Sequence, residues 1–379
     1  MKLIHLSDLH IGKRLREYSL LEDQEYILKK ILNVIDAEAP EGVIIAGDVY
    51  DKSVPSAEAV SLFDDFLSDL VKRGLQIFVI SGNHDSAERV AYMGRIVENA
   101  GVHLSPVYDG KVTPVVLEDA FGAVNIYMLP FIKPLTVKHC FEDAVINDYT
   151  DAVKTAVEHM SVDYTQRNVL ITHQFIADSE TCESEEVSIG GTDSVNVEAV
   201  SGFDYVALGH LHRPQCCKRE TVRYCGTPLK YSFSESKDKK SVTVVEMGEK
   251  GSVTVRTVPL VPKRDMVDLR GSFEELVQHG FYEGTTWQED YVRITLTDED
   301  VQPDAYAHLR NVYHKLMLIQ YDNTRTRANR NVSGPENVRQ KSPMELFSEL
   351  FEQQNNMPMS DAQRGYMEKI IAELKEGQA

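Results

Sequence analysis

The stretch Val43-Ile44-Ile45-Ala46-Gly47-Asp48-Val49-Tyr50-Asp51 joins a short apolar run to a glycine turn and two carboxylates. A β-branched apolar run that ends in polar residues predicts a buried strand. Four further runs have this form: Leu3–Leu6 before Ser7-Asp8-Leu9-His10, Ile77–Ile80 before Ser81-Gly82-Asn83-His84-Asp85, Val169–Thr172 before His173, and Tyr205–Leu208 before Gly209-His210-Leu211-His212.

Helical patterns lie between the first three of these runs in chain order. Leu20–Ala39 has apolar residues at helical spacing, and Ala57–Lys72 repeats the period. Strands that alternate with helices predict an α/β sheet, and such sheets bind ligands beyond the carboxyl ends of their strands. All five polar clusters therefore fall where a functional site is expected.

Beyond Pro262 the strand and helix patterns are shorter. They alternate as strand, helix, strand, helix and strand over Val267–Leu269, Ser272–His279, Tyr291–Leu296, Asp304–Tyr313 and Leu316–Gln320. Ser272 and Glu275 predict a capping box at the start of the first of these helices. We therefore expect a domain over 1–265 and a small α/β domain over 266–322.

The last part of the chain, 342–379, predicts two capped amphipathic helices after a polar linker over 323–341. The expected helices are Pro343–Gln354, which follows Ser342, and Asp361–Lys375, which follows Ser360. Their apolar stripes are Leu346, Phe347, Leu350 and Phe351 on the first, and Met367, Ile370, Ile371 and Leu374 on the second. Short helices need a surface for such stripes. That surface is either the preceding small domain or a partner.

Composition bounds the class of protein. The chain has 379 residues and a net charge of −19, with 42% hydrophobic and 26% charged residues, which excludes global disorder. It contains no apolar run of the roughly 18 residues that a membrane span needs, and its first residues form no secretory signal. Its five cysteines form no CxxC pair, which predicts reduced thiols. We expect a soluble protein of the cytoplasm.

Charge is unevenly distributed along the chain. Ile176–Val200 holds seven acids and no Lys or Arg, whereas His210–Arg264 holds twelve bases and five acids. Such runs are often solvated loop faces, so net charge alone does not decide for or against nucleic acid. Basic residues near the polar clusters are candidates for phosphate contacts: Lys13, Arg14, Arg16 and Arg213.

The polar clusters together supply seven oxygen and nitrogen donors and no thiolate. They are Asp8, His10, Asp48, Asn83, His173, His210 and His212. Any one of them could be a buried structural residue. As a set they suit two divalent first-row metal ions, provided that one carboxylate bridges the pair.

The ordered motifs DxH, GDxxD, GNHD, H and GHxH resemble those of the calcineurin-like metallophosphoesterases. The resemblance implies a layered α/β/β/α sandwich and two metal ions, with manganese as the implied metal. It implies that Asp8, His10, Asp48 and His212 hold one ion, and that Asp48, Asn83, His173 and His210 hold the other. His84 then matches the residue that protonates the leaving oxygen, and Asp85 the residue that orients this histidine.

Within that family the chain looks most like bacterial DNA nucleases that act with an ATPase. The likeness rests on Ser7–Lys13, Gly47–Lys52, Leu129–Phe131, Gly209–Pro214 and Tyr224–Phe233. It implies 3′–5′ double-strand exonuclease and single-strand or hairpin endonuclease activity in DNA repair, replication and recombination. It also implies a homodimer bound to two ATPase chains. In such a complex the domain over 266–322 would cover the DNA, and the helix pair over 342–379 would bind the ATPase. The chain has no Walker A loop, so any use of ATP must come from that partner.

Two alternatives remain open. Another phosphatase or phosphodiesterase of the family is the first, although Lys52 follows the second Asp of GDxxD where Ser/Thr phosphatases have Arg, and the third motif ends in Asp85 rather than Glu. The second is a non-catalytic scaffold for an ATPase. Such a scaffold is expected to have lost metal ligands, and none is missing here.

Overall fold

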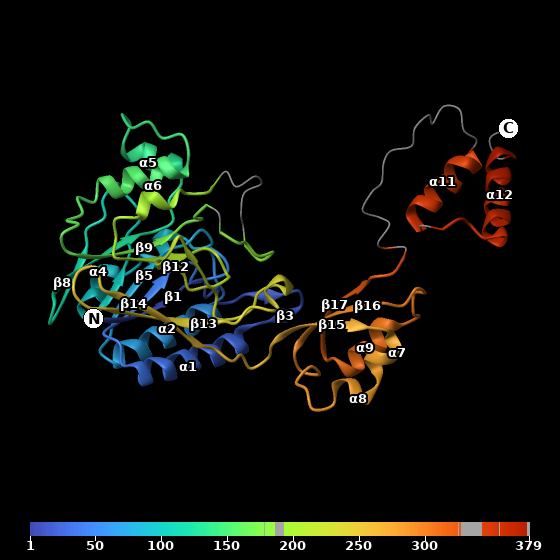
Figure 1. Ribbon diagram of the computed structural model, residues 1–379, viewed down its shortest axis with the longest axis horizontal. Helices are drawn as coiled ribbons and strands as arrows, with labels where there is room; N and C mark the ends of the chain where they lie inside the picture. The colour runs from blue at the N-terminus through green and yellow to red at the C-terminus, as the bar shows by residue number, and fades with distance from the viewer. Residues whose placement is uncertain (178, 186–192, 325, 327–342, 356, 377–379) are drawn as a thin grey trace. The chain divides into compact units, whose positions relative to one another are not determined.

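A computed structural model describes residues 1–177, 179–185, 193–324, 326, 343–355 and 357–376 of the chain (Figure 1). The chain divides into two compact units, Met1–Asp265 and Met266–Ala379.

The first unit contains two six-stranded sheets in its described residues. The first sheet has the order β14 (Val253–Pro259), β13 (Ser241–Met247), β1 (Lys2–Leu6), β4 (Gly42–Ala46), β5 (Gln76–Ile80) and β6 (Val102–Leu104). The second has the order β11 (Gln215–Cys217), β12 (Arg219–Tyr224), β10 (Tyr205–Gly209), β9 (Arg167–His173), β8 (Gly122–Leu129) and β7 (Val115–Asp119).

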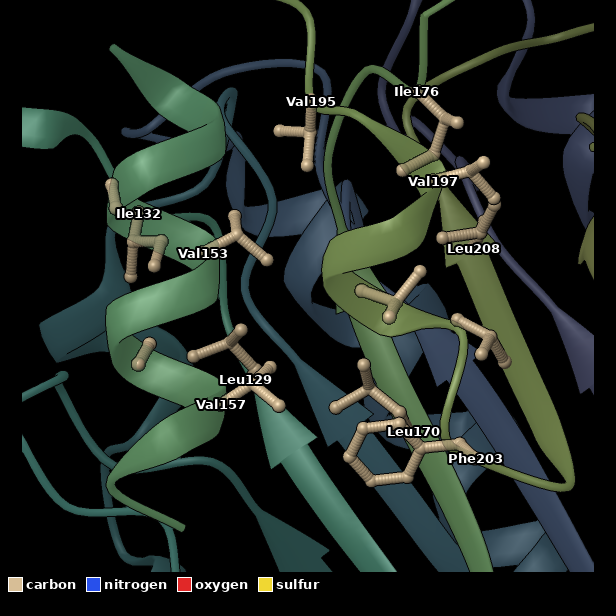
Figure 2. Packing of buried hydrophobic residues seen from close by; sticks show 14 of the residues in the cluster. Leu129, Ile132, Val153, Val157, Leu170, Ile176, Val195, Val197, Phe203 and Leu208 are labelled. Carbon is tan, nitrogen blue, oxygen red and sulfur yellow. The ribbon is translucent and has the colours of Figure 1, made fainter. Parts of the chain in front are cut away.

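Alternation along the strands builds a core on each face of the second sheet. Val169 and Ile171 of β9 belong to a buried cluster that includes Ile44 and Phe78 of the first sheet, so the two sheets pack face to face. Leu170, between them in sequence, belongs to a different cluster. Figure 2 shows this second core, in which Leu129 of the sheet lies beside Val157 of α6 (Tyr149–Glu158), while Leu170 lies beside Phe203 and Leu208 beside Val197.

Helices cover both outer faces of this sandwich (Figure 1). α1 (Leu21–Glu38) and α2 (Ala57–Lys72) contact each other, and α2 contacts β5 on the outer face of the first sheet. α5 (Pro134–Cys140) and α6 lie on the opposite side. Shorter elements complete the unit: β2 (Arg14–Leu15), β3 (Tyr18–Ser19), α3 (Ala87–Val90), α4 (Gly94–Val97), and 3₁₀ turns at Glu98–Ala100, Val197–Val200 and Phe233–Glu235. The predicted α/β/β/α sandwich is confirmed.

The five predicted apolar runs are strands β1, β4, β5, β9 and β10, as expected. β1, β4 and β5 are parallel neighbours in the first sheet, and β9 and β10 are parallel neighbours in the second. Backbone bonds tie the loops beyond them together, since Asp8 donates its N–H to Gly47 O at 3.0 Å and His10 to Asp48 O at 2.9 Å. The polar clusters are thus held at one end of the sandwich.

The second unit begins with a three-stranded parallel sheet of β15 (Met266–Gly271), β16 (Tyr291–Leu296) and β17 (Lys315–Tyr321). Its helices are α7 (Phe273–Val277), α8 (His279–Tyr282) and α9 (Ala305–Val312). The Ser272 hydroxyl accepts the Glu275 N–H at 3.3 Å, which caps α7 as predicted. Leu276, Ile294 and Leu309 are fully buried in its core.

The helix pair follows as α11 (Pro343–Asn355) and α12 (Asp361–Glu376), which contact each other. Ser360 and Gln363 form the predicted reciprocal cap: Ser360 N–H donates to Gln363 Oε1 at 3.0 Å, and Gln363 N–H to Ser360 Oγ at 3.3 Å. Most of the predicted linker, as well as Ser342 and the side chain of Leu374, lies outside the described residues.

Two expectations concern the chain as a whole. Among the helices that the structure describes, none combines the length and apolar character needed to span a bilayer. All five cysteines lie in described residues and are free thiols.

Candidate metal centre

The loops beyond the five strands adopt unusual backbone conformations. Asp8, His10, Asp48 and His210 have φ angles of 53°, 43°, 49° and 106°. Such conformations are costly for residues other than glycine and are found where the surroundings enforce them, often at functional sites. The motif glycines permit the close approach of these loops, because a Cβ on Gly209 would collide with Ala46 O and one on Gly82 with Asp48.

Three side chains form one half of the centre. Asp8, His10 and His212 are buried and place ligand atoms within 4.8 Å of one another. Both Asp8 oxygens accept the His210 N–H, at 3.0 and 3.2 Å, which fixes the carboxylate. His10 Nε2 lies 3.1 Å from His212 Nε2.

Three other side chains form the second half. Asn83 Oδ1 lies 3.0 Å from His173 Nε2 and 2.9 Å from His210 Nδ1. Phe131, in one of the segments that carry the family resemblance, stacks on His210 with ring centroids 6.5 Å apart.

Asp48 lies between the two halves. Its Oδ2 is 3.6 Å from His10 Nε2 and 3.3 Å from His173 Nε2. Its Oδ1 accepts the His84 N–H at 2.9 Å. All seven predicted metal ligands therefore lie in one group, with a single carboxylate oxygen facing both halves.

The hydrogen bonds of His173 test whether this group fits a cation. Its Nδ1 lies 2.8 Å from the Ala46 carbonyl oxygen, which can only accept, so Nδ1 carries the proton. Its Nε2 faces two acceptors, Asn83 Oδ1 and Asp48 Oδ2. Without a metal a second proton on the ring can bond to them, and a divalent cation bound to Nε2 and these oxygens would take the place of that proton, a donor set that suits first-row metals.

The electrostatics of the site reflect this burial. Burial raises the pKa of Asp8 to about 8 and lowers that of His210 to about 3. For Asp48 burial opposes ionisation, but the imidazoles of His173 and His10 hold its pKa well below the usual range. Burial opposes protonation of His173 as well, yet Asp48 raises its pKa to about 9. The site thus holds an ionised carboxylate that attracts positive charge.

His84 and Asp85 lie beside the centre with different partners. His84 Nδ1 lies 3.2 Å from the Asp51 carbonyl oxygen, and its ring is edge-on to His10 at 4.8 Å. Asp85 was expected to orient His84, but its carboxylate accepts backbone N–H groups from Val49, Tyr50 and Gly82 at 3.0–3.1 Å. Those bonds hold the loop that carries Asp48. The carboxylate of Asp85 is thus occupied by three backbone N–H donors.

Several residues around the centre were not predicted as site residues, although Tyr231 lies in one of the segments that carry the family resemblance. Gln24 donates to His10 O at 2.7 Å, and Tyr231 donates to Leu9 O at 2.5 Å. Both therefore hold the backbone of the loop after β1, which carries His10. Glu185 accepts the His212 N–H at 2.5 Å. Glu185 belongs to the acidic run, for which the sequence leaves a solvated face and a functional role open, and only the fold brings it to the site.

The four candidate DNA contacts have unequal surroundings. Arg14 and Arg16 are exposed. Lys13 pairs with Asp51 at 2.8 Å and lies over the Tyr231 ring. Arg213 pairs with two carboxylates, those of Asp238 and Glu180, which already balance its charge. The prediction for Arg213 therefore loses support, whereas Arg14 and Arg16 remain accessible.

The candidate partner contacts lie on α11 and α12. Leu350 is 50% exposed, whereas the other four described candidates are half-buried: Phe347, Phe351, Met367 and Ile370. Since the two helices contact each other, they cover part of their own apolar stripes and leave Leu350 accessible.

Comparison with known proteins agrees with this geometry. The family described as "Calcineurin-like phosphoesterase" matches residues 1–214, and SbcD_C, described as "Type 5 capsule protein repressor C-terminal domain", matches residues 262–355. The chain is 32% identical over 323 residues to the D subunit of nuclease SbcCD from Staphylococcus epidermidis, covering 84% of this chain and 85% of that protein. The protein of the same name from Staphylococcus saprophyticus is 31% identical, with 84% of each covered.

A solved dimetal phosphatase from Danio rerio is 8% identical, with a TM-score of 0.40, and the match covers 69% of this chain and 96% of that one. The two family matches and the two relatives confirm the resemblance drawn from the motifs. The chain belongs to the calcineurin-like phosphoesterase family and, within it, to the family of SbcD nucleases.

Proposed function

We propose that this chain is the metal-dependent nuclease component of an SbcC–SbcD-type complex and hydrolyses phosphodiester bonds in DNA. The observation that carries the proposal is the position of Asp48, whose Oδ2 faces His10 on one side and His173 on the other. A single shared carboxylate between two sets of nitrogen and oxygen donors is what a two-metal phosphoesterase requires.

The residues present fit two divalent ions. Asp8, His10 and His212 would hold one ion, and Asn83, His173 and His210 the other, with Asp48 shared. Ions bound there would lower the pKa of an attacking water and neutralise charge on the phosphoryl oxygens. Manganese is the metal that the family resemblance implies.

His84 is the residue proposed to move a proton. The Asp51 carbonyl accepts from Nδ1 and holds the ring, which leaves Nε2 to exchange a proton with the substrate. A protonated Nε2 donates to the departing 3′ oxygen as charge develops on it. Asp85 acts on this step indirectly, by fixing the backbone of the Asp48 loop.

The partner follows from the relatives, whose shared name describes one component of a nuclease, SbcCD, that has a second component. We assign the helix pair over 342–379 to binding of that second component, SbcC, with Phe347, Leu350, Phe351, Met367, Ile370 and Leu374 as contacts. An amphipathic helix pair that exposes Leu350 suits a hydrophobic groove on a partner. The assembly would contain two SbcC and two SbcD chains joined through an SbcD homodimer.

The remaining parts of the proposal concern DNA. The α/β unit over 266–322 would cover the DNA near the centre, and Lys13, Arg14 and Arg16 would contact phosphates. The expected activities are 3′–5′ double-strand exonuclease and single-strand or hairpin endonuclease, used in DNA repair, replication and recombination in the cytoplasm.

Hydrolysis of two substrates tests this function. The purified protein, with Mn²⁺ and with or without SbcC and ATP, is given a DNA hairpin and p-nitrophenyl phosphate. Metal-dependent cleavage of the hairpin in preference to the phosphomonoester is expected. Preference for the phosphomonoester would indicate a phosphatase, and no hydrolysis of either would indicate a scaffold.

A further inference from the structure

The geometry points to Ser184 and Glu235 as positioning residues that fix the tautomer of His212 and so prepare one half of the metal centre. This inference rests on the proposed two-metal function. Ser184 lies outside the motifs and segments that carry the family resemblance, and both residues lie far from His212 in the sequence.

A chain of hydrogen bonds runs from His212 away from the centre. His212 Nδ1 lies 2.7 Å from Ser184 Oγ, and Ser184 Oγ lies 2.7 Å from Glu235 Oε1. Nδ1 and the carboxylate are 3.9 Å apart, so the hydroxyl connects groups that do not bond directly. The Glu235 side chain is fully buried.

The direction of these bonds follows from what each group can do. An ionised carboxylate only accepts, so Ser184 must donate its single proton to Glu235. Its oxygen can then only accept from His212, and Nδ1 must carry the proton. The lone pair of the neutral ring is thereby left on Nε2, the atom that lies 3.1 Å from His10 Nε2.

Glu235 is held by several donors. Oε2 accepts from Lys240 Nζ at 2.6 Å, and Oε1 accepts the Tyr231 N–H at 3.2 Å and the Ser232 hydroxyl at 3.0 Å. Lys240 also donates to His212 O at 2.8 Å. The buried Lys240 cation keeps Glu235 ionised and therefore an acceptor. The hydrogen bonds from His212 through Ser184 to Glu235, here called the relay, are thus all donated toward Glu235.

The two halves of the centre are prepared differently. His173, in the other half, donates its Nδ1 proton to the Ala46 carbonyl oxygen and needs no side chain for this. Loss of the Ser184 hydroxyl should therefore weaken Mn²⁺ binding in the half that contains His212 and leave Mn²⁺ binding unchanged in the half that contains His173. A general disturbance of the fold would weaken both.

Titration calorimetry with Mn²⁺ as the probe, on the full chain, distinguishes these outcomes. Wild type should bind two Mn²⁺. Ser184→Ala should keep one site unchanged and raise the Kd of the other about 10–100-fold, the usual effect of losing a partner that orients a metal ligand. Ser184→Thr, which restores the hydroxyl, should restore that Kd. Ser232→Ala is the matched control, because it removes a hydroxyl from the same carboxylate without touching His212.

Each variant bears on a separate claim. A Ser184→Ala protein that binds two Mn²⁺ as tightly as wild type would overturn the relay, as would equal losses in Ser184→Ala and Ser232→Ala. Failure of Ser184→Thr to recover, with an unchanged melting temperature, would also count against it. If wild type itself bound fewer than two Mn²⁺, the proposed function would fail rather than the relay alone.

Discussion

The imidazoles of His10 and His212 face each other with their Nε2 atoms 3.1 Å apart, although they come from loops that are 202 residues apart in the sequence. Both side chains are buried. The hydrogen bonds of His212 leave a lone pair on its Nε2, which can accept the Nε2 proton of a neutral His10 ring. A cation held by both rings and by Asp8 would take the place of that proton.

Asp48 and His84 should separate metal binding from proton transfer. Asp48→Ala removes the carboxylate that faces both halves, so it should lower bound metal and abolish nuclease activity. His84→Ala should keep the metal and lose about 10²–10⁴-fold in cleavage rate, the usual contribution of a general acid. Elemental analysis of both variants beside a nuclease assay checks this. Equal loss of metal in the two proteins would remove the proton-donor role of His84.

Asp85→Asn should act on the Asp48 loop. The amide offers one acceptor oxygen for three backbone donors and turns an NH₂ group toward one of them, which costs about 1–3 kcal/mol. We expect a lower melting temperature and weaker Mn²⁺ binding, measured by thermal unfolding and calorimetry, with His84→Ala as the comparison. Normal stability and metal affinity with lost activity would instead support an orienting role toward His84.

Asp119→Asn should reveal a pH-dependent part of the stability. Arg167, which is buried beside Asp119 with Nη2–Oδ1 at 2.5 Å, holds the pKa of that carboxyl below its ordinary value. A carboxyl with a lowered pKa in the folded state stabilises above its unfolded pKa, and this contribution is lost as the pH falls through the folded one. At pH 7 the variant should be about 1–3 kcal/mol less stable, with the gap closing below about pH 4.

Chemical denaturation of both proteins between about pH 2 and pH 7 checks the Asp119 prediction, since this range brackets the ordinary carboxyl pKa. Glu118→Gln, at an exposed position of the same strand, is the control and should change little. A gap between wild type and Asp119→Asn that stayed constant to the acid end of the range would contradict the role given to the ion pair.

Truncation after Asp322 should separate partner binding from chemistry. The shortened protein should fail to co-purify with SbcC but retain bound Mn²⁺ and hydrolysis of a small phosphodiester. Leu350→Asp should weaken co-purification within the full chain, whereas Glu368→Gln, at an exposed position of α12, should not. Wild-type affinity of the truncated protein for SbcC would exclude the helix pair as the binding element.

Strands and ligand clusters could be predicted because both are local. The run Val43–Ala46 is long enough to reveal a buried strand, and Gly47-Asp48 marks its end. The antiparallel edge strands β7 and β14 were missed, since both alternate half-buried and exposed residues and give a weak pattern. The division of the five strands between two sheets depends on pairing, which no single run contains.

The surroundings of the ligands could not be predicted for a different reason. Ser184 and Glu185 contact His212 from 28 and 27 residues away in sequence, and Glu235 Oε1 lies 3.9 Å from His212 Nδ1 and accepts the Ser184 hydroxyl. The composition of the acidic run does not decide between a solvated face and a functional role, and only the folded chain shows that one of its carboxylates accepts the His212 N–H. Arg213 beside His212 suggests a phosphate contact until Asp238 and Glu180 are seen to pair with it.

Anomalous diffraction from crystals grown with Mn²⁺ would locate the bound ions themselves. We expect two anomalous peaks, one among Asp8, His10 and His212 and one among Asn83, His173 and His210, with Asp48 contacting both. A single peak, or peaks that Asp48 does not join, would contradict a two-metal centre built around that carboxylate.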